Sequence, residues 1–205
     1  MGAQVLLYWA NITGYIRLAL VLAAWAAYET PSLFVPLYSS SVLLDGVDGW
    51  LARRLNQCSR FGAWLDVVVD NLGRGMLWSL LFKWGWLVSA VEWCVFVCNH
   101  SARGDRWKNS FSTSPPLIQA IMSNGFRTPL GLWVVSGLHL LPLWLYGFQR
   151  GLLSHWLDVP LWIQTQGTVM LAAGRLLALS AEMWCIWTHI QYLTRDSDES
   201  EEKNN

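Results

Sequence analysis

Four aspartates are the residues in this sequence whose type and spacing could do chemistry. The first pair, Asp45 and Asp48, is three positions apart, and the second, Asp66 and Asp70, is four apart. Each pair therefore shares one face of a helix. All four lie in largely apolar stretches, where an aspartate at the bilayer centre costs about 2.5–3.5 kcal/mol on insertion scales. We expect the four carboxylates to face each other in a wet, protein-lined cavity, where a cation offsets their repulsion.

Two neighbouring helices must position these pairs. We take Arg54 and Arg60 as the ends of a short turn; Asp48 lies six residues before the first, and Asp66 six residues after the second. At 1.5 Å rise per residue, both aspartates lie about 9 Å from the turn, at matching depth on antiparallel helices. The other aspartate of each pair then lies about one turn deeper. The spacing therefore predicts four carboxylates at two matched levels.

Carboxylate oxygens favour hard divalent cations. All-oxygen ligation suits Mg²⁺ or Mn²⁺ and disfavours zinc. Such ions, when held by carboxylates, bind and neutralise phosphates and pyrophosphates. Gly49, Ala52 and Gly62 lie along the same strip and leave room for a bulky headgroup against the backbone. The sequence therefore predicts one or two divalent ions and a phosphorylated ligand.

The rest of the chain has the composition of an integral membrane protein. Of its 205 residues, 54% are hydrophobic and 14% are charged, whereas soluble chains carry about 25% charged residues. The net charge of zero gives no support to a nucleic-acid partner, and the four cysteines in or beside apolar stretches argue against a disulfide scaffold. We expect an all-α polytopic protein with six spans, at roughly 8–28, 31–53, 61–82, 85–102, 129–148 and 167–190. A polar loop, 104–127, and a more apolar connection, 149–166, join the later spans.

The distribution of lysine and arginine predicts the orientation in the membrane. With six spans, nine of these residues lie on the side of both termini and two on the other side. Basic residues favour the cytosolic side, so both termini are expected in the cytosol. We expect a transmembrane domain over 1–194 and a solvated acidic cytosolic tail over 195–205, which holds five of the 14 acids.

The aspartates belong to a longer motif that resembles a family signature. It reads Asp45-Gly-Val-Asp48-Gly49-Trp-Leu-Ala52-Arg53, eight residues, Gly62, three residues, Asp66, three residues, Asp70. Residues and spacings match the signature of the CDP-alcohol phosphotransferase family at every position. The runs 55–62 and 11–17 are similar to those of the phosphatidylinositol synthase branch of that family. The close resemblance covers about 11–75.

The resemblance implies a reaction and a role for each position. Enzymes of this branch transfer a phosphatidyl group from CDP-diacylglycerol to myo-inositol and release CMP, with Mg²⁺ or Mn²⁺ as cofactor. By position, the ligands of two metal ions would be Asp45, Asp48, Asp66 and Asp70, and the last would also be the general base. The CDP moiety would contact Gly49, Ala52, Arg53, Ser59 and Gly62, with Asn11, Arg17 and Arg74 as further substrate contacts. The resemblance also implies a homodimer among membrane lipids of the endoplasmic reticulum, with the active site facing the cytosol.

Three alternatives stay open. Arginine typically follows the last aspartate in this branch, whereas here Asn71 follows Asp70 and the nearest arginine is Arg74; the acceptor alcohol could therefore differ. The same family chemistry could also use a CDP-alcohol as donor and diacylglycerol as acceptor. A transporter or cation channel could use the aspartates as an ion path. Broken helices or paired repeats around a midplane site are typical of transporters, and the acids here cluster towards one face instead.

Overall fold

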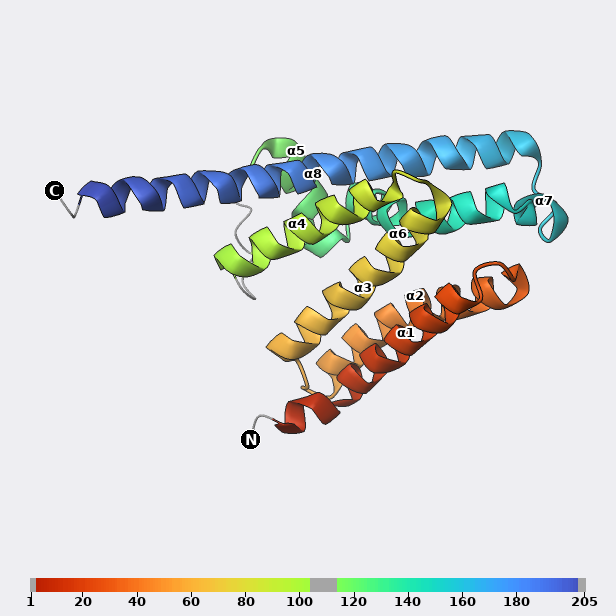
Figure 1. Ribbon diagram of the computed structural model, residues 1–205, viewed down its shortest axis with the longest axis horizontal. Helices are drawn as coiled ribbons and strands as arrows, with labels where there is room; N and C mark the ends of the chain where they lie inside the picture. The colour runs from red at the N-terminus through yellow and green to blue at the C-terminus, as the bar shows by residue number, and fades with distance from the viewer. Residues whose placement is uncertain (1–2, 104–113, 203–205) are drawn as a thin grey trace. The chain divides into compact units, whose positions relative to one another are not determined.

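The computed structural model describes residues 3–103 and 114–202, and every regular element in these ranges is a helix (Figure 1). The long helices are α1 (Trp9–Ala26), α2 (Pro31–Arg54), α3 (Arg60–Leu81), α4 (Gly85–Arg103), α6 (Pro129–Gln149) and α8 (Leu161–Glu202). The short ones are η1 (Ala3–Leu7), α5 (Pro116–Met122), η4 (Ser123–Phe126) and α7 (Leu152–His155). The all-α fold class is confirmed, and the first five long helices agree with the predicted apolar segments, whereas α8 extends beyond the predicted 167–190 at both ends.

The connections contain more helix than the sequence predicted. The described part of the predicted loop 104–127 holds α5 and η4, and residues 104–113 lie outside the described ranges. Pro116 opens α5, where its fixed φ suits a first helical turn. The α8 helix begins directly after Pro160 and continues to Glu202, into the predicted tail. The predicted span ended where the apolar residues end, whereas the helix itself continues through the polar residues that follow.

Two helices are long and apolar enough to cross a membrane by length and composition. They are α6 and the part Leu161–Thr194 of α8. A shorter apolar stretch, Gly85–Asn99, lies in α4. The charged side chains of α2 and α3 lower the hydropathy of the helices that hold the aspartates. These apolar helices are consistent with a membrane protein, and the number of six spans stays a prediction.

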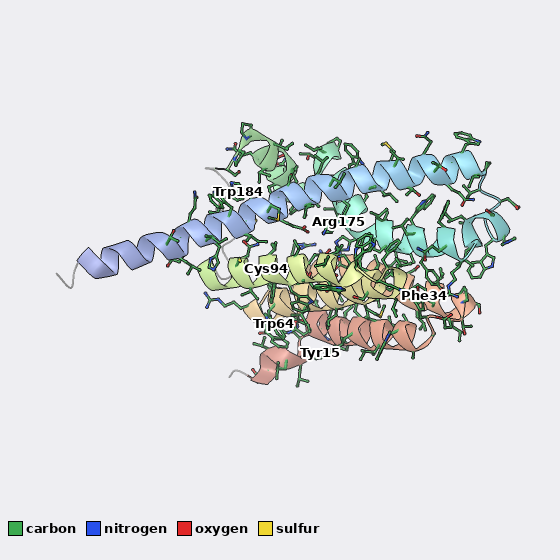
Figure 2. The ribbon with its side chains drawn as sticks, turned by 45° about the horizontal axis from the view of Figure 1, so that its top comes forward. Tyr15, Phe34, Trp64, Cys94, Arg175 and Trp184 are labelled. Atoms are coloured by element: carbon green, nitrogen blue, oxygen red, sulfur yellow. The ribbon has the colours of Figure 1, made fainter. Side chains whose placement is uncertain are left out.

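The chain divides into two units, Met1–Ser89 and Ala90–Asn205. In the second unit, α6 packs along α8. Arg175 of α8, labelled in Figure 2, is buried there and pairs with Glu182 at 2.9 Å and with Glu92 of α4 at 3.5 Å. This unit therefore keeps its buried charge paired inside an apolar helix assembly.

The first unit contains all the predicted site residues. Its α1 helix packs against both α2 and α3. Val21 of α1 forms a small core with Leu65 and Val69 of α3. A Cβ atom at Gly14 would lie 2.8 Å from the Leu65 side chain, so glycine permits this close approach of α1 to α3. The packing brings α1 alongside the helices that hold the aspartates.

A short turn joins α2 to α3 at the predicted position. Asn56 adopts the left-handed conformation, with φ of 52°, directly after α2 ends. The Ser59 Oγ accepts a hydrogen bond from the Gly62 N–H at 3.0 Å and caps α3. The Trp9 N–H donates to Gln57 Oε1 at 2.9 Å. The turn is therefore fixed both to α3 and to the start of α1.

Candidate functional site

The four aspartates come together between α2 and α3, each of which packs against α1. One carboxylate oxygen from each of Asp45, Asp48 and Asp66 lies within 4.8 Å of the others. Asp70 belongs to the same group, because one arginine side chain contacts it and the other three aspartates. The helical period places both members of each pair on one face, as the spacing predicted. All four predicted metal ligands thus lie in one cluster.

The shared partner is Arg17 of α1, whose guanidinium bonds to all four carboxylates. Nη1 contacts Asp48 Oδ2 at 2.5 Å and Asp66 Oδ1 at 2.8 Å, and Nη2 contacts Asp45 Oδ1 at 2.7 Å and Asp70 Oδ1 at 2.6 Å. Each nitrogen bridges one aspartate of α2 and one of α3, at the two levels that the spacing predicted. The side chain of Arg17 is 1% exposed. The Ser41 Oγ donates to the Arg17 carbonyl oxygen at 3.1 Å and holds α1 beside α2.

A second arginine contacts Asp70. Arg74 lies one turn further along α3 and donates through Nη1 to Asp70 Oδ2 at 3.2 Å. Its Nη2 donates to Asn71 Oδ1 at 2.7 Å. Both Asn71 and Arg74 are buried. Asn71 therefore orients the Arg74 guanidinium against Asp70.

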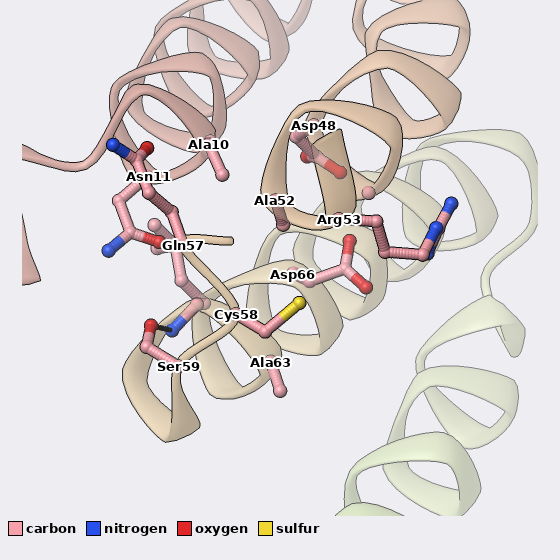
Figure 3. A pocket seen from close by; sticks show the side chains of 14 residues that line it. Ala10, Asn11, Asp48, Ala52, Arg53, Gln57, Cys58, Ser59, Ala63 and Asp66 are labelled. Atoms are coloured by element: carbon pink, nitrogen blue, oxygen red, sulfur yellow. Dashed lines mark hydrogen bonds between the residues drawn. The ribbon is translucent and has the colours of Figure 1, made fainter. Parts of the chain in front are cut away.

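A pocket of about 180 Å³ lies beside the cluster (Figure 3). All the residues predicted to contact CDP line it, namely Gly49, Ala52, Arg53, Ser59 and Gly62. Asn11, Asp48 and Asp66 line it as well. The sequence reasoning missed Gln57 and Cys58, which come from the turn and also line the pocket. Their position in a polar turn between two motif residues was the signal that could have identified them.

Arg17 and Arg74 differ from the other predicted substrate contacts. Neither is among the residues that line the pocket. Both are buried and donate to aspartates of the cluster. The structure thus places them on the acidic side chains themselves, whereas Asn11 lies in the pocket wall.

Gly62 lies where three segments of the first unit meet. A Cβ atom there would lie 2.7 Å from Asn11 Oδ1 and 3.1 Å from Ser59 Oγ. Asn11 is 1% exposed, and its side-chain amide donates to the Val5 carbonyl oxygen. A side chain at position 62 would therefore displace the α1 wall of the pocket or the cap of α3.

Comparisons with known proteins agree with this geometry. Residues 7–103 match the family described as CDP-alcohol phosphatidyltransferase. CDP-diacylglycerol–inositol 3-phosphatidyltransferase 1 of Arabidopsis thaliana is 46% identical over 79 residues, which cover 38% of this chain and 35% of that protein. CDP-diacylglycerol–inositol 3-phosphatidyltransferase of Saccharomyces cerevisiae is 40% identical over 94 residues, which cover 45% and 40%. CDP-diacylglycerol–glycerol-3-phosphate 3-phosphatidyltransferase of Blochmanniella floridana is 40% identical over 48 residues, which cover 23% and 25%.

The matched segment contains the whole acidic cluster and every residue that lines the pocket. The chain spans less than half the length of these curated relatives. No solved structure matches the chain. The signature, the cluster and the family match concern the same helices. Residues 7–103 therefore match the CDP-alcohol phosphatidyltransferase family over the segment that holds the candidate site.

Proposed function

We propose that this chain transfers the phosphatidyl group of CDP-diacylglycerol to myo-inositol, releases CMP and forms phosphatidylinositol. The observation that carries the proposal is the cluster of four carboxylates beside a pocket lined by the matched motif. The names of the Arabidopsis and yeast relatives supply the two substrates. The proposed enzyme is thus a phosphatidylinositol synthase-like CDP-alcohol phosphatidyltransferase.

We assign the four aspartates as ligands of two Mg²⁺ or Mn²⁺ ions. The donor set fits these hard cations, because every donor is a carboxylate oxygen. Three of the oxygens lie within 4.8 Å of one another, close enough to share one ion. The guanidinium of Arg17, bonded to all four carboxylates, supports a cation-binding role for these oxygens. When bound, the ions would neutralise charge on the pyrophosphate and on the CMP leaving group.

The pocket wall offers groups that suit the CDP moiety. Arg53 carries its guanidinium beside Gly49, where a Cβ atom would lie 3.4 Å from both Nη atoms, so a phosphate that passes over this glycine could reach it. Such contacts between a planar guanidinium and phosphate oxygens are strong and directional. Ala52 and Gly62 present little side chain and keep the wall open. The nucleotide is therefore placed against the α2–α3 turn.

Asp70 is assigned as the general base. Its side chain is 22% exposed, and Arg17 and Arg74 hold its two oxygens. The acceptor hydroxyl gives its proton to Asp70, and its oxygen forms the new bond to the phosphorus that carries the diacylglycerol. The bond from that phosphorus to the CMP oxygen then breaks, and CMP leaves with the electron pair. Arg74 fixes the orientation of the carboxylate for this transfer.

A transferase assay tests the proposal. The purified full chain in detergent is incubated with labelled inositol, CDP-diacylglycerol and Mg²⁺ or Mn²⁺. Label is expected in the lipid fraction only when metal and both substrates are present. Label that enters lipid from another alcohol instead would change the acceptor and keep the reaction class. No metal-dependent release of CMP from any CDP substrate would contradict the proposal.

Asn71 bears on which alcohol the acceptor site binds. This residue stands where the related branch has arginine, and Arg74 lies beside Asp70 with Asn71 as its partner. We infer that Arg74 supplies the positive charge near the acceptor hydroxyl. The name of the Blochmanniella relative includes glycerol 3-phosphate, so this alcohol is the second candidate acceptor. Parallel assays with myo-inositol and glycerol 3-phosphate discriminate the two.

Asn71→Leu tests this placement of Arg74. The change removes the acceptor of the 2.7 Å hydrogen bond and leaves a buried donor without it, a loss that typically costs about 1–3 kcal/mol. We expect the KM for the alcohol to rise roughly ten-fold while the KM for CDP-diacylglycerol stays within about two-fold. Asn71→Gln, which keeps an amide oxygen, should recover part of the loss. A rise confined to the KM for CDP-diacylglycerol would contradict the placement.

Gly62→Ala tests the pocket, with Gly46→Ala as its matched control. An added Cβ at position 62 would meet Asn11 Oδ1 at 2.7 Å, whereas nothing lies within 4 Å of one at position 46. We expect Gly62→Ala to raise the KM for CDP-diacylglycerol at least about ten-fold, since a displaced pocket wall loses contacts throughout binding. Gly46→Ala should match wild type, because alanine also favours the helix. Equal kinetics for the two variants would show that the pocket does not bind the nucleotide.

We further propose six membrane spans, with both termini and the active site facing the cytosol, in the endoplasmic reticulum membrane. The six long helices overlap the predicted spans, and the lysine and arginine distribution supports the orientation. We also propose that the chain forms a homodimer among membrane lipids. It consists, in this proposal, of a transmembrane domain over 1–194 and a tail over 195–205. This orientation gives the acidic cluster direct access to cytosolic inositol.

A further inference from the structure

The position of Arg17 has a consequence for metal binding. Its guanidinium spans both levels of the cluster, with one nitrogen at each level. It is among the largest side chains that lie under 2% exposed. A buried cation is stable only where it is paired and hydrogen-bonded. Arg17 is therefore a built-in counter-ion for the four aspartates.

A divalent ion would use the carboxylates that this guanidinium contacts. The separation of the oxygens of Asp45, Asp48 and Asp66 suits one ion among them, and Mg²⁺ binds its oxygen ligands at about 2.0–2.1 Å. An ion on those oxygens would lie within about 4–5 Å of a guanidinium on the same atoms, where like charges repel strongly away from bulk water. The ion and the guanidinium cannot both be held well by the same carboxylates.

Nothing else among the described residues fixes the Arg17 guanidinium. Its Nε is buried without a hydrogen-bond partner there, so the bonds of its side chain are the Nη contacts to the aspartates. The Ser41 bond holds the backbone carbonyl of Arg17 and not its side chain. An incoming ion that takes over the carboxylates would therefore release the guanidinium.

We propose that Arg17 is a tethered competitor of the metal: it holds the four aspartates together before an ion binds, and it must leave them when one does. The inference rests on the proposed function, because it takes the cluster as the metal site. Arg17 thus lowers the metal affinity of the site while it stabilises the metal-free protein. It acts as a positioning residue, through the aspartates that it contacts.

Metal binding to the full chain tests this without any turnover. Mn²⁺ affinity is measured by electron paramagnetic resonance on detergent-purified protein with no CDP substrate present. We expect Arg17→Gln to bind Mn²⁺ at least about ten-fold more tightly than wild type. Arg17→Lys keeps the positive charge but loses the planar guanidinium with its several donors. Its Mn²⁺ affinity should therefore lie between those of wild type and Arg17→Gln. In EDTA, Arg17→Gln should melt at a lower temperature than wild type, and Mn²⁺ should close that gap.

Arg74→Gln is the matched control. It removes the same charge, but in the ion pairs of the described residues Arg74 contacts only Asp70 of the four aspartates. It should tighten Mn²⁺ binding by less than about three-fold. Equal or weaker Mn²⁺ binding by Arg17→Gln, or equal tightening by both variants, overturns the inference and leaves the proposed transferase standing. If no protein binds Mn²⁺, the metal site itself is wrong and both proposals fail. Should Arg17→Gln fold only with Mn²⁺ present, that dependence supports the inference, and Arg17→Lys supplies the affinity.

Discussion

Asp70→Asn is expected to lower kcat by about 10²- to 10⁴-fold, which is the usual contribution of a positioned general base. Asparagine keeps the shape of aspartate, and its single oxygen can accept one of the two hydrogen bonds that Arg17 and Arg74 donate to separate oxygens of Asp70, at 2.6 and 3.2 Å in the native protein. It has no site that takes a proton at neutral pH. The loss should therefore appear in kcat, with the KM for CDP-diacylglycerol within a few-fold of wild type.

The measurement is the initial rate of label transfer at saturating CDP-diacylglycerol, inositol and Mn²⁺. Asp158→Asn is the matched control, because Asp158 is exposed in the second unit and its φ of 49° suits asparagine equally well. Thermal melting of both variants separates lost chemistry from lost folding. A properly folded Asp70→Asn protein that keeps a tenth or more of the wild-type kcat would exclude Asp70 as the base.

The arrangement of the aspartates could be predicted because it depends on local geometry. The helical rise and period fix where residues six, nine or ten positions from a turn must lie. Only the turn had to be identified, and its ends at Arg54 and Arg60 agree with the ends of α2 and α3. The shared Arg17 nitrogens then reproduce the two predicted levels. Local periodicity was sufficient for this part of the site.

The role of Arg17 could not be read from its position in the sequence. It lies 31 residues before Asp48 and 53 before Asp70, so its contacts depend on how α1 packs. That packing includes the close approach of Gly14 to Leu65, a contact that no periodicity reveals. The sequence therefore predicted a charged residue near the cavity, and it assigned that residue to the substrate.

The limits of the helix prediction have a similar cause. The apolar spans were recognised by hydropathy. Hydropathy does not detect a helix that continues through polar residues, as α8 does where it enters the predicted tail. The same criterion passes α6 and α8, whose faces are apolar, and does not pass α2 or α3. The helices that carry the chemistry are those whose polar residues weaken the signal. Charged side chains at the candidate site thus lower the mean hydropathy of the helices that carry them.

Asp66→Asn is expected to abolish activity at ordinary metal concentrations, and the loss should differ in kind from that of Asp70→Asn. Asp66 offers one of the three oxygens that lie within 4.8 Å of one another, and it is 44% exposed at the pocket side. An amide is a poorer ligand for a hard divalent ion, since it is neutral and has one oxygen. We expect the Mn²⁺ concentration for half-maximal activity to rise at least about 10²-fold, since even residues that only orient a metal ligand contribute about 10–100-fold.

Excess Mn²⁺ separates the two roles. It should restore much of the activity of Asp66→Asn, because a weakened site fills again by mass action. It should leave Asp70→Asn inactive, because no metal concentration supplies the missing proton acceptor. Titrations of both variants over the same Mn²⁺ range, with Asp158→Asn beside them, give the comparison. If the half-maximal Mn²⁺ concentration of Asp66→Asn equals that of wild type, Asp66 does not bind the ion, and the cluster holds its charge for another purpose.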